Sequence, residues 1–150
     1  MSNTDSIVNA QELPCGARFF RCALQVNPFD YIVRHSKETV FNNESNYNAA
    51  IVEACQRIGI EVIGITDHQR CSTGQSLAES LRAAGMIVFP GAEVETKEDV
   101  QVLLLFEPNA SWERCKGILG DCGIHDQSNP PAAIKYDVRE LMRESVKWTC

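Results

Sequence analysis

Two short apolar runs, each ending in residues that can bind a metal, constrain the fold of this chain more than any other feature. The run 60–66 is rich in β-branched residues and ends in Asp67 and His68, and the run 87–92 ends in Glu93. Runs of this kind predict two buried strands. Because α/β folds place their chemistry at the carboxyl ends of parallel strands, these three side chains form the candidate site.

Segments with helical spacing alternate with the apolar runs. The expected elements, in order, are a strand over 18–26, a long loop over 27–45, a helix over 46–58 capped by Ser45, a strand over 61–66, a helix opened by a capping box at Ser72 and Gln75, short strands over 87–89 and 92–96, a buried strand over 100–106, a helix capped by Ser111, a loop over 120–131, and a helix capped by Asp137 and Glu140. Gly59 and Gly85 stand where the first two helices should stop.

This alternation predicts an α/β fold with a mainly parallel sheet covered by helices, either an incomplete barrel or an open doubly wound sheet. With 150 residues, of which 44% are hydrophobic, we expect one domain over 14–150 behind a flexible tail over 1–13. The last residues, 147–150, look like the start of another strand. We therefore expect the natural protein to continue beyond Cys150.

Composition narrows the classes of function. Lys and Arg number 14 against 20 Asp and Glu, for a formal net charge of -6, so attraction to nucleic acid over the whole surface is not expected. No apolar run approaches the roughly 20 residues that a membrane helix needs. The polar first thirteen residues do not resemble a secretory leader, and the seven cysteines are an odd number. We therefore expect a soluble, cytoplasmic protein with reduced thiols.

The two central motifs carry a resemblance to a known family. Ile65-Thr-Asp-His68 and Pro90-Gly-Ala-Glu93, with a helix between them, resemble the PHP (polymerase and histidinol phosphatase) family. Its distorted (β/α)7 barrel holds up to three metal ions at the carboxyl ends of the strands. The opening segment 16–27 resembles the PHP domain at the front of TrlF-type proteins, which carry an AAA-like or SMC-like ATPase downstream. The resemblance implies an incomplete PHP-like barrel and covers roughly 16–106.

The family pattern fails at its first motif, a His-x-His pair at the end of strand one. Gln25 and Asn27 stand at those positions, with Ala23 where an Asp is usual. An imidazole nitrogen is a strong ligand for zinc or manganese, whereas a neutral amide offers only a weak carbonyl oxygen. The replacement therefore removes the core of one metal site.

Three positions still match the family. His68 resembles a metal ligand of the second motif, Asp67 its neighbouring carboxylate, and Glu93 the carboxylate that bridges two metals. The family's further ligands lie on strands beyond residue 150. At most a partial site for Zn, Mn or Fe at His68 and Glu93 is expected. Alternatively, His68 hydrogen-bonds a loop, and Glu93 caps a strand or pairs with Arg70 or Lys97.

Other residues are weaker candidates as ligands. Asp30 and His35, in the loop after strand one, could replace the lost pair, although polar loop residues are usually only solvated. Cys115, Cys122 and His125 could clip a zinc ion, but their spacing matches no recognised pattern and Cys115 is needed on the buried face of its helix.

Two functions of different class follow. In the favoured one, the chain is a degenerate PHP-like module that serves as a non-catalytic scaffold or regulatory domain, attached to an ATPase domain or a partner subunit of a nucleic-acid-processing or phage-defence protein. In the alternative, it is a divalent-metal-dependent phosphoesterase or nuclease. Glu93 then bridges two ions, His68 and Asp67 hold one of them, and a metal-generated hydroxide attacks a phosphate ester or nucleic acid in line.

Overall fold

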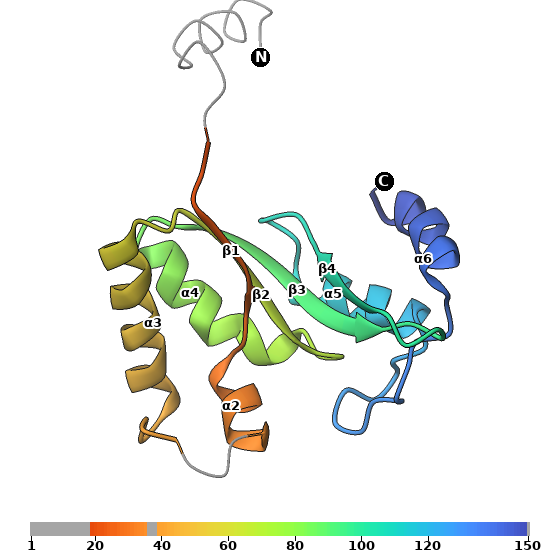
Figure 1. Ribbon diagram of the computed structural model, residues 1–150, viewed down its shortest axis with the longest axis horizontal. Helices are drawn as coiled ribbons and strands as arrows, with labels where there is room; N and C mark the ends of the chain where they lie inside the picture. The colour runs from red at the N-terminus through yellow and green to blue at the C-terminus, as the bar shows by residue number, and fades with distance from the viewer. Residues whose placement is uncertain (1–18, 36–38, 150) are drawn as a thin grey trace, which may run out of the picture.

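A curled four-stranded sheet forms the centre of the computed structural model, which describes residues 19–35 and 39–149. The strands follow chain order across the sheet: β1 (Cys22–Val26), β2 (Val62–His68), β3 (Ile87–Glu95) and β4 (Gln101–Leu105) (Figure 1). The first three are parallel, and β4 returns antiparallel to β3. The α/β class and the mainly parallel sheet are thus confirmed.

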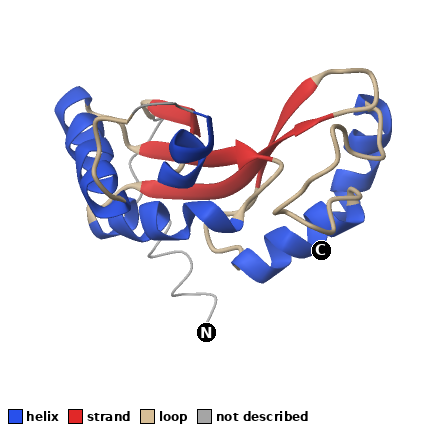
Figure 2. Ribbon diagram, turned by 90° about the horizontal axis from the view of Figure 1, so that it is seen from below, coloured by secondary structure: helices blue, strands red, loops and turns tan. Residues whose placement is uncertain are grey.

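Five α-helices accompany the sheet in the described residues. They are α2 (Phe29–His35), α3 (Glu44–Ile58), α4 (Gln75–Ala83), α5 (Trp112–Asp121) and α6 (Val138–Ser145), with 3-10 turns over Ser72–Gly74 and Val146–Thr149. The long helices lie along one side of the sheet (Figure 2). None of the helices within 19–35 and 39–149 is long and apolar enough to cross a membrane.

The core consists of two buried clusters on the helix-covered side of the sheet. The first joins β2 and the start of β3 to α3 and α4 through Tyr47, Cys55, Ile63, Ile65, Leu77, Ala78, Leu81, Met86 and Val88. The second joins the end of β3 to α5, α6 and the loop between them through Cys71, Ala92, Val94, Cys115, Leu119, Cys122, Ile124, Ile134 and Leu141. Trp112 packs against both clusters. Burial of these side chains fixes β2 and β3, and so fixes where their carboxyl ends lie.

The other side of the sheet is concave, and two glycines permit its curl. A Cβ atom on Gly91 would lie 2.4 Å from the carbonyl oxygen of Leu104 and 3.2 Å from that of Ile65. A Cβ on Gly64 would lie 2.6 Å from the carbonyl oxygen of Leu24, and the side chain of Leu105 covers both glycines. Backbones of neighbouring strands therefore approach too closely for any other residue.

The segment 27–45 is not one long loop, because it contains α2. Pro28 begins this helix by accepting hydrogen bonds at its carbonyl oxygen from the amides of Tyr31 and Ile32. Asp30 in the first turn pairs with Arg34 in the last, with Nε and Oδ2 2.7 Å apart. The helix α3 then begins one residue after Asn43, whose side chain accepts from the amide of Asn46, so Ser45 is not its cap.

Two other expectations differ from the structure. The capping box at Ser72 and Gln75 is absent, because a 3-10 turn precedes α4 and the helix begins after Gly74 with no side-chain cap. The two short strands around Pro90 are one strand, β3. Proline has no N–H to donate to a neighbouring strand. Position 90 tolerates this loss because it lies opposite Phe106, just past the end of β4.

The end of the described chain also departs from expectation. Residues Val146–Thr149 form a 3-10 helix rather than a strand, and β4 is a half-buried edge strand rather than a buried one. Only Leu141 of α6 is buried, and Met142 is 67% exposed. The tail expected over 1–13, the first residue of the strand expected over 18–26, and Cys150 lie outside the described residues.

The close approach of the strands predicts opposite effects of two Gly to Ala changes. Gly91→Ala should lower the free energy of unfolding by about 2 kcal/mol or more, because the new methyl group meets backbone on both sides. Gly117→Ala, in α5 with open space around it, should raise that free energy by up to about 1 kcal/mol through helix propensity. Urea unfolding of both variants measures the contrast, and equal effects would contradict the tight curl.

Stability of α6 should depend on pH through Glu140. Hydrogen bonds from the Asp137 amide and then from Lys97 hold the pKa of Glu140 below its ordinary value of 4.5. A lowered folded pKa contributes stability that is present above pH about 4.5 and is lost as the pH falls through the folded pKa. Helical chemical shifts over 138–145 should therefore decrease below that pH in the wild type. In Glu140→Gln they should not change over this range.

Candidate functional site

The three predicted site residues lie together at the carboxyl ends of β2 and β3. His68 is directly opposite Glu93 in the parallel register, and Asp67 is opposite Ala92. Successive side chains of a strand point to opposite faces, so His68 and Glu93 share the concave face while Asp67 points to the helix-covered side. The fold therefore divides the candidate site between two faces of the sheet.

Asp67 is almost fully buried, and its carboxylate is fully hydrogen-bonded. Nη2 of Arg34 lies 2.6 Å from Oδ1 and 2.5 Å from Oδ2. The hydroxyl of Thr73 donates to Oδ2 at 2.7 Å, and the amide of His68 donates to Oδ1 at 2.7 Å. With 1% of its side chain exposed, Asp67 receives from Arg34 the compensating charge that a buried carboxylate requires.

Arg34 holds α2 against the end of β2. Phe29 and Ile32 of this helix pack against the first cluster, and the pairing of Arg34 with Asp67 adds a polar contact with the end of β2. Partial burial alone would lower the pKa of Arg34, but the hydrogen bonds and charges of Asp67 and Asp30 outweigh it and raise the pKa. The guanidinium is therefore a permanent positive charge at the position where a metal ion could otherwise compensate Asp67.

On the concave face, an amide contacts the second carboxylate. Nε2 of Gln25 crosses β2 and donates to Oε2 of Glu93. Nδ1 of His68 lies 4.0 Å from Oε1 of the same carboxylate, and the side chains of His68 and Glu93 are 33% and 12% exposed. The amide of Gln25 thus acts as a hydrogen-bond donor to Glu93.

Buried polar atoms without a partner gather near the ends of β1 and β2. They are Oδ1 of Asn27, Oγ1 of Thr66, Oε1 of Gln69 and Nε of Arg70. Gln69 also has a left-handed backbone with φ of 53°, and its amide donates to the carbonyl oxygen of Glu93 at 2.7 Å. Strain and unpaired polar atoms of this kind cluster at functional sites.

Other sequence candidates have different partners. Asp30 pairs with Arg34, and the ring of His35 lies against that of Tyr31 with centroids 4.4 Å apart. The partners expected for Glu93 were wrong: Arg70 donates to the carbonyl oxygen of Ser128, and Lys97 pairs with Glu140.

The cysteines behave as core residues. Cys115 is buried on the inner face of its helix, as the sequence predicts, and Cys122 is buried beside it in the second cluster. Burial raises the pKa of Cys115 to about 12 and that of Cys122 to about 11, while His125 is exposed. In the part of the chain that the structure describes, no three His, Cys, Asp or Glu side chains come together as metal ligands.

Arg34 and Thr73 are the site residues that sequence reasoning missed. The spacing of Asp30 and Arg34 on one helical face was a signal, but it appears only once the segment is recognised as a helix. Nothing in the sequence singled out Thr73, because a threonine at the start of an expected helix needs no further explanation.

The burial of Asp67 predicts a large effect of removing its partner. Arg34→Met should lower the free energy of unfolding by about 3 kcal/mol, since it leaves a buried carboxylate without a counter-charge. Asp30→Asn removes the more exposed partner of Arg34 and should cost less than about 1 kcal/mol. The double variant Arg34→Met/Asp67→Asn should recover part of the loss. Equal effects of Arg34→Met and Asp30→Asn in denaturant unfolding would contradict this assignment.

Comparisons with known proteins give one weak likeness. No protein-family profile matches the sequence, and no curated protein sequence matches it. Among solved structures, the chain is similar to that of an inferred metal-dependent phosphoesterase from Bifidobacterium adolescentis, with a TM-score of 0.39 and 18% sequence identity. The match covers 71% of this chain and 34% of that chain, so this chain spans about a third of the length of that protein.

Proposed function

We propose that this domain is a PHP-like scaffold or regulatory module without catalytic activity of its own, in which side chains of the chain take over the positions of metal ions. The observation that carries this proposal is the contact of Arg34 with both carboxylate oxygens of Asp67. A guanidinium and a divalent cation fulfil the same electrostatic need of a buried carboxylate, and only one of them can occupy its lone pairs.

The residues present do not fit a metal centre at Asp67. A divalent ion there would have to displace Arg34 and the Thr73 hydroxyl. Breaking a buried ion pair costs about 3–5 kcal/mol, and the freed guanidinium would repel the incoming ion. Asp67 therefore serves the fold by anchoring α2 rather than serving a reaction.

His68 and Glu93 offer only part of a ligand set. Glu93 is hydrogen-bonded by Gln25, and His68 adds one imidazole beside it. Zinc sites ordinarily use three or four protein ligands, so two supply a weak site at best. A partial Zn, Mn or Fe site at His68 and Glu93 would therefore hold its ion too weakly to saturate in a calorimetric titration.

The wider setting rests on the motif resemblance alone. Within the proposal, the four-stranded sheet is the front of a seven-stranded PHP-like barrel, in a cytoplasmic protein that carries an ATPase domain or binds a partner subunit. Processing of nucleic acid or defence against phage would then be the function of the whole assembly, and this domain would position the other parts of that assembly.

Restoring the lost ligands tests the proposal. Isothermal titration with Mn²⁺ and hydrolysis of p-nitrophenyl phosphate should show no saturable site and no metal-dependent turnover in the wild type. The variant Gln25→His/Asn27→His should gain a Mn²⁺ site, because it returns two imidazoles at the end of the sheet where Gln25 now contacts Glu93. The matched variant Gln25→His/Asn27→His/Glu93→Gln, which lacks that carboxylate, should bind Mn²⁺ more weakly.

Activity as a metal-dependent phosphoesterase would overturn this proposal. In that case the wild-type protein should hold metal in a one-to-one ratio and hydrolyse the phosphate ester. Loss of both metal and turnover in His68→Ala, with the fold intact by circular dichroism, would establish it.

A further inference from the structure

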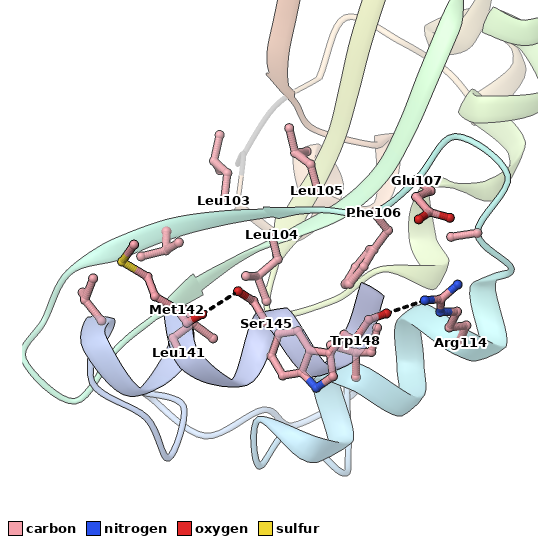
Figure 3. A pocket seen from close by; sticks show the side chains of 14 residues that line it. Leu103, Leu104, Leu105, Phe106, Glu107, Arg114, Leu141, Met142, Ser145 and Trp148 are labelled. Carbon is pink, nitrogen blue, oxygen red and sulfur yellow. Dashed lines mark hydrogen bonds between the residues drawn. The ribbon is translucent and has the colours of Figure 1, made fainter. Parts of the chain in front are cut away.

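We draw no further inference here: the strongest candidate, the apolar groove between β4 and α6 that is lined by Leu104, Leu141 and Met142 (Figure 3), is an unpartnered apolar face, and nothing in the described part of the chain shows what covers it.

Discussion

The buried carboxylate of Asp67 is the constraint on which the rest of the site depends. A charge placed at the end of a buried strand has to be compensated locally, and the chain does so with Arg34, the Thr73 hydroxyl and a backbone amide. This requirement helps to hold α2, whose Phe29 and Ile32 pack against the first cluster, over the end of the sheet. It also draws Thr73 toward β2, in the turn where a capped helix start was expected. One electrostatic need thus shapes two neighbouring segments.

The curl of the sheet separates this carboxylate from the other candidate ligands. Gly64 and Gly91 let the strands approach closely on the concave face, where His68 and Glu93 lie. Asp67 points to the opposite side, among the helices. Gln25 crosses β2 to reach Glu93, so each carboxylate of the candidate site has its own partner within the chain.

Sequence reasoning succeeded where local chemistry decides structure. The caps at Ser111 and at Asp137 with Glu140, and the left-handed glycines after α3 and α4, follow from short motifs. Sequence reasoning failed where contacts between residues far apart in the sequence determine the structure. The three-residue turn at 97–99 is too short for a parallel connection, so the antiparallel β4 could have been foreseen. The site positions were predictable from spacing, but their partners were not, because Arg34 and Thr73 meet Asp67 only in the folded chain.

The most direct test of the account is a titration of the ¹⁵N-labelled protein with Mn²⁺, which broadens the amide signals of nuclei near a bound ion. If Arg34 and Gln25 occupy the carboxylates, the amides of Asp67, His68 and Glu93 should broaden no earlier than those of exposed acidic residues elsewhere on the surface. Selective, saturable broadening of these three amides at stoichiometric Mn²⁺ would contradict the account, since it would require an ion to be held where the structure places a guanidinium and an amide.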